Sequence, residues 1–598
     1  MTAYLTQHFD NARTGWNPAE TKLTVSNVSQ NFGVLFQLPV DAQVYAQPLV
    51  VPDVPVTGRS PLNLVFVATE ANSVFAFDAD RPGPWVWHRV LMNSGETPVP
   101  WGDVANNEIN AANIIPVIGI TATPAIDPVT QILYVVTKVK AGNGYHQRIH
   151  ALDIATGRDR AGSPVEVTAS FQGTGQGARD SQGHILFDPL RQLNRPGLLL
   201  AGGKLYVAFG SHGDTVDPAT HAPYPYHGWV LSYDAATLKQ LAVFNSTPDI
   251  DPVVERLAQG WGGQTGAIWQ AGMGLTSDPE GNIYCVTGNG PFNADSGGRD
   301  YGDTVLKLNP QLHVVDYFTP CDQADLLAWD FDHGSGGVML LPPVAARSPA
   351  KLLVHCAKWG VIYALNADKM GGYSGSGHWP ACHDDVVWRS PYRIGPGQGG
   401  IPAILGGPAY FRDAGGRELV YLCAFGDRLK AYEVGPTGAL SLLSSSLNKF
   451  TIGEGGAIPA VSSNGSTVGT AIVWLVARSN PLRLFAYDAT NLVTKVFEGD
   501  AGAWPNAHGG AFMVPTVANG KVYVGSDGQV TVFGLLPCKT EMDAVTALQN
   551  EVDTLSEALA NGEILKSHEA AARAQLVKLE RQLLGVEKAL SDCQARNP

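Results

Sequence analysis

The chain has 598 residues, of which 44% are hydrophobic and 16% charged, and it contains 67 glycines and 40 prolines, a composition typical of a globular protein rich in β-strands and turns. A formal net charge of −14 provides no basic surface for nucleic acid or an anionic membrane, and no apolar run is long enough to span a bilayer. Residues 1–16 lack the basic and apolar regions of a Sec-type signal, which predicts a cytoplasmic protein or one released by a signal-independent route.

A repeated unit of two short strands occupies most of the chain. Eight times, a run rich in aromatic and β-branched residues is followed by a polar turn and a second such run; examples are LVFVATEANSVFAFDAD (64–80), LLVHCAKWGVIYALNAD (352–368) and KVYVGSDGQVTVFGLL (521–536). Period-two alternation over such short runs, bounded by Gly, Asn and Asp, predicts antiparallel hairpins. Small-residue segments such as ATPAID and VPTVANG precede most hairpins and suit the innermost strand of a blade.

The repeat predicts an all-β fold, an eight-bladed β-propeller over residues 31–537, preceded by a lead-in of residues 1–30. The last unit lacks an outermost strand, whereas residues 31–41, NFGVLFQLPVD, form a strand without a hairpin of their own. We expect these two to pair, because this would complete the eighth blade and remove both open sheet edges of the ring.

The composition changes after Pro537, and residues 538–598 predict a short helical tail. Apolar residues follow one another at spacings of three and four in two series, which are Val545, Leu548, Val552, Leu555 and Leu559, and then Leu576, Leu579, Leu583, Val586 and Leu590. They indicate a coiled-coil seam, either between the two helices as a hairpin or between subunits. A helical tail that lies on the propeller wall is the alternative.

Seven cysteines form no C-x-x-C pair and no adjacent pair, so neither a zinc site nor a dense disulfide framework is indicated. We therefore expect reduced, buried thiols. Cys538 and Cys593 flank the helical tail and could meet there, which the sequence leaves open.

The repeat resembles that of the pyrroloquinoline quinone (PQQ) propeller family, which includes quinoprotein alcohol dehydrogenases and non-catalytic relatives. The segment IWQAGMGLTSDPEGNIYCVTGNGPFN is similar to the one that carries the tryptophan floor under the quinone and an asparagine metal ligand, which implies Trp269 and Asn289. LLAWDFDHGSG resembles the segment with the catalytic base, which implies Asp330 as the base and as a metal ligand. Asp332 matches the extra carboxylate of lanthanide-using members. AKWGVIYALNAD resembles the strand whose cation reaches the quinone oxygens, which implies Lys358.

This resemblance implies a quinone made electrophilic by a hard cation, calcium or a lanthanide, with Asp330 as the base that takes the alcohol proton. We expect Trp269, Asn289, Asp330 and Lys358 to sit on different blades, at strand ends that converge on one channel mouth. The chain departs from the family in two respects. The glutamate metal ligand is missing, so that only Asp214 could substitute, and His227 stands where the family has Arg; there is also no adjacent Cys-Cys pair.

Three functions are compatible with these features. The first is a binding or scaffolding propeller, multimerised by its C-terminal helices, that takes a protein partner or a small-molecule or sugar ligand at the ring face. The alternative is a PQQ- and calcium- or lanthanide-dependent dehydrogenase of an alcohol or sugar. The third is a carbohydrate-binding ring, with Trp261, Trp379 and Trp504 as candidate aromatic platforms. Under the non-catalytic functions, Asn289, Asp330 and Asp332 would cap turns at strand ends.

Overall fold

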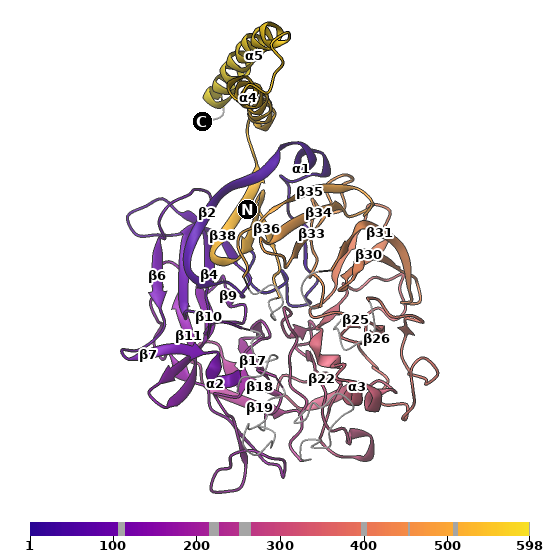
Figure 1. The fold of residues 1–598 in the computed structure, drawn as a ribbon. Coiled ribbons are helices and arrows are strands. Elements are labelled where there is room, and N and C mark those ends of the chain that lie inside the picture. The colour runs from indigo at the N-terminus through magenta and orange to yellow at the C-terminus, as the bar shows by residue number, and fades with distance from the viewer. Residues whose placement is uncertain are drawn as a thin grey trace.

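The computed structural model describes residues 1–105, 114–213, 226–249, 265–395, 403–451, 455–505 and 512–596. Eight blades, each built on four antiparallel strands, are arranged around a central axis, and two helices follow them at the C-terminus (Figure 1). The predicted eight-bladed β-propeller is therefore confirmed.

The first four blades follow one another along the chain, each beginning with its innermost strand. Blade 1 comprises β3 (Leu49–Val54), β4 (Leu62–Ala68), β5 (Ser73–Asp78) and β6 (Trp87–Val90); blade 2 comprises β9 (Ala125–Asp127), β10 (Ile132–Ala141), β11 (Gly144–Asp153) and β12 (Val165–Glu166); blade 3 comprises β16 (Leu199–Ala201), β17 (Lys204–Ser211), β18 (Trp229–Asp234) and β19 (Gln240–Asn245); blade 4 comprises β20 (Thr276–Ser277), β21 (Ile283–Val286), β22 (Val305–Leu308) and β23 (Val314–Phe318). Short strands β7 (Glu96–Pro100) and β8 (Val117–Ile118) extend blade 2.

The remaining blades repeat this order until the ring closes. Blade 5 comprises β24 (Val338–Leu340), β25 (Leu352–Cys356), β26 (Ile362–Asn366) and β27 (Trp388–Arg389); blade 6 comprises β28 (Ala409–Arg412), β29 (Glu418–Cys423), β30 (Asp427–Val434) and β31 (Leu440–Phe450); blade 7 comprises β32 (Ala460–Ser462), β33 (Ile472–Ala477), β34 (Arg483–Asp488) and β35 (Lys495–Asp500); blade 8 comprises β36 (Thr516–Ala518), β37 (Lys521–Gly525), β38 (Asp527–Leu535) and the early strand β2 (Phe32–Gln43).

The ring is closed by the pairing of β2 with β38, as predicted. Phe32 lies opposite Leu535 and Leu38 opposite Val530 in an antiparallel register. Strand β2 is thus the outermost strand of the last blade. Its pairing with β38 closes the ring and leaves no open sheet edge where the two ends of the chain of blades meet.

The N-terminal segment, residues 4–17, is more than a lead-in, because it bonds to the first strand of every blade or to the residue just before it. Its backbone and side chains reach, in order around the ring, Val50, Ile126, Leu198 and Leu200, Ser277, Leu340, Tyr410, Val461 and Val517. Arg13 is fully buried and donates to the carbonyl oxygens of Leu275 and Leu198. The segment lies across one end of the channel and links all eight blades.

Helices α4 (Lys539–Ala560) and α5 (Glu569–Arg596) form an antiparallel hairpin that stands off the ring, close to α1 (Val25–Asn31) (Figure 1). Val552, Leu579 and Leu583 form its buried seam, and the Cys538–Cys593 disulfide closes its open end. Of the arrangements that the sequence allowed, the structure contains the hairpin and not a tail along the propeller wall; pairing with a second chain stays a prediction. Among the helices that the structure describes, none is long and apolar enough to cross a bilayer.

The expectation of reduced thiols is correct for Cys285, Cys356 and Cys423, which are free and buried. It is wrong for Cys321 and Cys382, which form a disulfide across 61 residues of sequence. The two meet because the segment before blade 5 and the long connection inside blade 5 come together in space, which no cysteine spacing reveals.

Candidate functional site

Five of the predicted site residues meet at one end of the channel, between blades 4 and 5. Trp269 precedes β20 and Asn289 follows β21; Asp330 and Asp332 precede β24, and Lys358 follows β25. Because neighbouring strands of a blade run antiparallel, the start of its first strand and the end of its second lie at the same end. The expected convergence is observed, but on two adjacent blades. The expectation of four different blades is wrong because each blade supplies both kinds of strand end.

The polar groups of the cluster contact one another directly. The Nζ of Lys358 lies 2.6 Å from Oδ2 of Asp332 and 3.2 Å from Oδ1 of Asp330. Asn289 donates its side-chain amide to Oδ1 of Asp330 at 3.1 Å and its backbone N–H to Oδ1 of Asp332 at 2.9 Å. One ammonium and one amide therefore hold two carboxylates side by side.

Trp269 forms the apolar side of the cluster. It is 9% exposed, and its ring lies edge-on to that of Tyr226 at 6.3 Å. The chain passes so close at Gly288 that a Cβ there would lie 2.7 Å from the indole of Trp269 and 2.5 Å from Oδ1 of Asp332. Glycine at 288 is therefore needed for the close packing of the backbone against the indole and the carboxylate, directly before Asn289.

A short helix, α3 (Gln323–Trp329), sets the position of Asp330. Asp330 is its C-cap in the left-handed conformation, with φ 57°, and its N–H bonds to the carbonyl of Leu326. Aspartate is one of the few residues besides glycine that tolerate this conformation, because its short polar side chain bonds locally. The helix end therefore orients the carboxylate toward Asn289 and Lys358.

The cluster is electrostatically unusual. Burial raises the pKa of Asp330 to about 6, while the nearby Lys358 ammonium opposes the rise and Asp332 adds to it. At neutral pH the group is still mostly ionised, so it can accept a proton. Behind it, burial raises the pKa of Asp303 well above its ordinary value, and Asp303 accepts the backbone N–H of His333. Our sequence reasoning missed Asp303, for which the string YGDTV carries no particular signal.

The donor set fits a hard cation. Oδ1 of Asn289 is buried and has no hydrogen-bond partner among the described residues, although buried polar atoms are nearly always paired. It lies beside two carboxylates, and amide and carboxylate oxygens are the ligands that calcium and lanthanides prefer. Within the described ranges no three Asp, Glu, His or Cys side chains could hold a metal by themselves, so Asn289 would have to contribute. Asp214, the remaining predicted ligand, lies outside the described residues.

His227 does not take the role of the arginine that it replaces. It is buried, with Nε2 2.9 Å from the carbonyl of Gln176 and Nδ1 3.2 Å from Oγ1 of Thr247. Both ring nitrogens therefore already have partners, one of them in the segment between blades 2 and 3, and burial lowers the pKa of the ring.

The channel carries cations that the sequence analysis did not single out. The guanidinium of Arg195 lies 4.3 Å from the ring centre of Phe512, and that of Arg478 lies 5.5 Å from the same centre. Arg195, Phe512 and Gln7 of the N-terminal segment line a cavity of about 20 Å³. This volume has room for about one water molecule. The described residues around Gln7 and Phe512 are therefore closely packed at this level of the channel.

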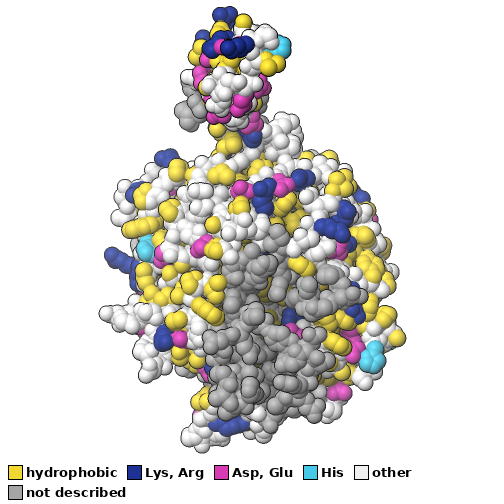
Figure 2. Space-filling model, in the orientation of Figure 1, with side chains coloured by type: hydrophobic (Ala, Val, Ile, Leu, Met, Phe, Trp, Pro, Cys, Tyr) yellow, Lys and Arg dark blue, Asp and Glu magenta, His cyan; other side chains and the backbone are white. Residues whose placement is uncertain are grey.

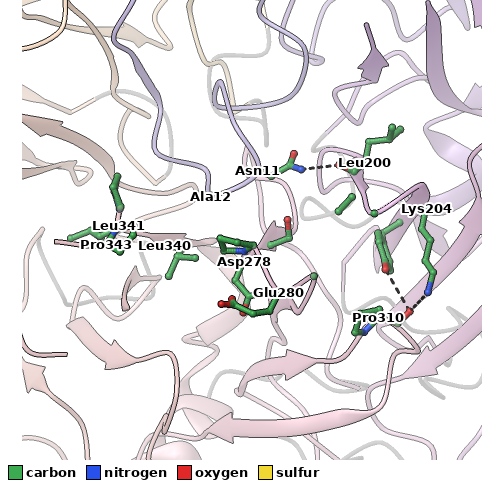
Figure 3. Close-up of a pocket in the computed structure, with 17 residues that line it drawn as sticks. Asn11, Ala12, Leu200, Lys204, Asp278, Glu280, Pro310, Leu340, Leu341 and Pro343 are labelled. Atoms are coloured by element: carbon green, nitrogen blue, oxygen red, sulfur yellow. Dashed lines mark hydrogen bonds between the residues drawn. The ribbon is translucent and has the colours of Figure 1, made fainter. Parts of the chain in front are cut away.

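A larger pocket, of about 640 Å³, opens at the other end of the channel (Figure 3). Asn11, Asp278 and Leu340 line it, and the last two lie at or just beyond the far ends of β20 and β24 from the cluster. Its polar groups are bonded within the protein, for example Lys204 to the carbonyl of Pro310 at 2.7 Å. This pocket therefore does not serve the candidate site.

Of the three aromatic platforms predicted for a carbohydrate ligand, the structure contradicts one. Trp504 is fully buried, because it packs against Tyr45 inside the ring. Trp379 is half-buried, with the guanidinium of Arg393 4.4 Å from its ring centre, and Trp261 lies outside the described residues.

Comparison with known proteins agrees with the fold. No protein-family model matches the sequence, and no curated protein is similar to it. Among solved structures, the chain resembles quinohemoprotein alcohol dehydrogenase ADHIIG from Pseudomonas putida HK5, with a TM-score of 0.52 and 16% identity over 89% of this chain and 80% of that one. The corresponding values are 0.53, 16%, 89% and 80% for quinohemoprotein alcohol dehydrogenase from Comamonas testosteroni, and 0.53, 15%, 89% and 98% for a europium-containing methanol dehydrogenase. At such identities the likeness establishes the shared propeller fold.

Proposed function

We propose that the chain is a dehydrogenase that oxidises an alcohol with a pyrroloquinoline-type quinone and a hard cation, calcium or a lanthanide. The observation that carries the proposal is the meeting of Asn289, Asp330, Asp332 and Lys358 beside the ring of Trp269. These residue types are those that the quinoprotein resemblance implies, and the ring fold is that of alcohol and methanol dehydrogenases.

The quinone, when bound, would supply the acceptor for the hydride of the alcohol carbon. The residues of this chain would do the rest. Asp330 would accept the hydroxyl proton, Lys358 would offset negative charge, and Trp269 would offer a flat apolar face. Asn289 and Asp332, together with Asp330, would hold the cation, which would share with Lys358 the two carboxylates that the ammonium contacts.

Turn capping explains only part of the cluster. It accounts for the backbone N–H of Asn289 that Asp332 accepts. It does not account for the unpartnered Oδ1 of Asn289, nor for two carboxylates gathered around one lysine. The scaffolding role, which the sequence also allowed, draws no support from the structural relatives, so the dehydrogenase is the better supported function.

The proposal includes an oxidising compartment. Disulfides persist outside the reducing cytoplasm, and the chain contains two of them, Cys321–Cys382 and Cys538–Cys593. A dehydrogenase that passes electrons to an acceptor outside the cytoplasm would work in the same kind of compartment.

The test is to add PQQ with calcium, and separately with lanthanum, to the purified full chain. We expect a higher unfolding midpoint, bound-quinone absorbance and alcohol oxidation coupled to an artificial dye. Asp330→Asn should remain folded and lose roughly 10²- to 10⁴-fold in kcat, the usual size of a general-base contribution. Asp295→Asn, a change at an exposed carboxylate of the neighbouring blade 4, serves as the matched control. No response to quinone with either cation would overturn the proposal.

A further inference from the structure

The Cys321–Cys382 disulfide lies at one end of α3 and the candidate base at the other. Cys321 immediately precedes Asp322, the N-cap of the helix, and Asp330 is its C-cap. Cys321 is buried, whereas Cys382 is half-buried on the connection between β26 and β27. A helix of only seven residues therefore separates a covalent crosslink from the cluster.

The same connection holds the start of α3 through several further contacts. Asp384 accepts the backbone N–H of Cys321 at 2.8 Å, and Gly377 donates its N–H to the carbonyl of Cys321 at 2.8 Å. Arg389 lies between the two partners, with Nη1 2.6 Å from Asp384 and 3.3 Å from the sulfur of Cys321. The disulfide is the covalent member of this set of contacts, and together they fix where residues 321–322 lie against the connection.

A residue within α3 also contacts the connection between β26 and β27. Nδ1 of His378 lies 2.8 Å from the carboxylate of Asp325, but the histidine is largely exposed and the pair is weak in water. At the far end, the N–H groups of both Asp330 and Phe331 bond to the carbonyl of Leu326. A shift of the helix therefore carries Asp330 with it, and Asp332 two residues later.

We infer that the Cys321–Cys382 disulfide is a positioning link for the candidate site. It fixes α3 so that Asp330 and Asp332 meet Asn289 and Lys358. Reduction by a dithiol would exchange the protein S–S bond for two cysteine thiols and leave the dithiol as its own disulfide, and it would release the helix and lower both cation affinity and turnover. The effect on turnover rests on the proposed function, whereas the effect on α3 does not.

The chain offers a matched control, because its second disulfide lies in the hairpin away from the site. We would compare Cys321→Ser/Cys382→Ser with Cys538→Ser/Cys593→Ser in the full chain. Amide hydrogen exchange of residues 323–330 reports on the helix. Terbium luminescence sensitised by tryptophan, with Trp269 beside the cluster, reports on cation affinity. With quinone and calcium, kcat, KM and the pH profile of kcat report on the base.

The site variant should exchange α3 amides faster and lose roughly 10- to 100-fold in terbium affinity, the range for changes in groups that support metal ligands. Its kcat should fall more than its KM changes, and the pH midpoint of kcat should shift; the hairpin variant should match the unchanged protein. If the site variant fails to fold, brief treatment of the folded chain with dithiothreitol gives the same readings.

Two results would overturn the inference: unchanged exchange of α3, or faster exchange with unchanged terbium affinity. A chain that neither binds terbium nor oxidises alcohol would refute the proposed function instead. In that event the exchange comparison alone decides whether the disulfide positions α3.

Discussion

Nζ of Lys358 lies 2.6 Å from Oδ2 of Asp332, and the two side chains are 15% and 8% exposed. Removal of one partner from such a pair leaves the other charge buried, which is more costly than removal of both. Asp330 remains 3.2 Å from the ammonium when Asp332 is changed, so the loss is smaller than for an isolated pair. We expect Asp332→Asn to lower the free energy of unfolding of the cation-free chain by about 1 to 3 kcal/mol.

A double-mutant cycle checks this coupling. Lys358→Met should cost less in the Asp332→Asn background than in the unchanged chain, with a coupling of roughly 1 to 3 kcal/mol measured from denaturant unfolding. Strictly additive effects would show that the two charges do not act as a pair.

The N-terminal segment predicts a second effect on stability. Arg13→Ala removes donors from the backbone carbonyls of Gln7, Leu275 and Leu198, of which Leu198 keeps the hydroxyl of Thr6 as a donor. We expect a loss of roughly 3 to 5 kcal/mol, seen as a lower unfolding midpoint, because each unsatisfied buried group costs about 1 to 3 kcal/mol. Arg59→Ala, at an exposed position, should change the midpoint little. Equal midpoints for the two variants would mean that the segment does not hold the blades together.

A third prediction concerns pH. Arg148 binds both oxygens of Glu96, at 2.9 and 2.8 Å, and its hydrogen bonds lower the pKa of Glu96 from 4.5 to about 2. Because the folded-state pKa is depressed, the stabilisation is fully present above pH 4.5 and is lost as pH falls toward 2. Glu96→Gln should therefore cost about 1 to 2 kcal/mol at pH 7, after allowance for solvent screening, and progressively less below pH 4.5. Unfolding midpoints of both proteins across this range measure it, and a difference that persists unchanged to pH 2 would contradict it.

The helical hairpin gives a fourth prediction. The apolar seam of the hairpin is buried between its two helices. Val577 and Leu584, one heptad apart on α5, are nevertheless 56% and 66% exposed. Figure 2 shows apolar side chains on the surface of the hairpin. We expect these residues to mediate the predicted self-association of the chain. Sedimentation should show an assembly for the full chain and a smaller species for Val577→Lys/Leu584→Lys and for a chain that ends at residue 537. Monomeric mass for the full chain would exclude association through the hairpin.

Much of the fold could be predicted because it depends on local sequence patterns. Period-two runs such as LVFVA and SVFAF pair with the next strand along the chain, and a strand at residues 31–41 without a hairpin had one open edge to join. The candidate site was located only through its resemblance to quinoprotein segments. Asp303 and Arg195 carry no such signal, since their burial depends on neighbours far away in sequence.

The sequence by itself therefore determined the number of blades, the closing strand and the two C-terminal helices, whereas the five side chains at strand ends came from the family resemblance. Only the tertiary structure decided that Asn289 meets Asp332, that Cys321 meets Cys382, and that residues 4–17 touch all eight blades. The physical reason is that strand period and turn chemistry act between chain neighbours, whereas these contacts depend on how the closed ring brings distant segments to the same end of one channel.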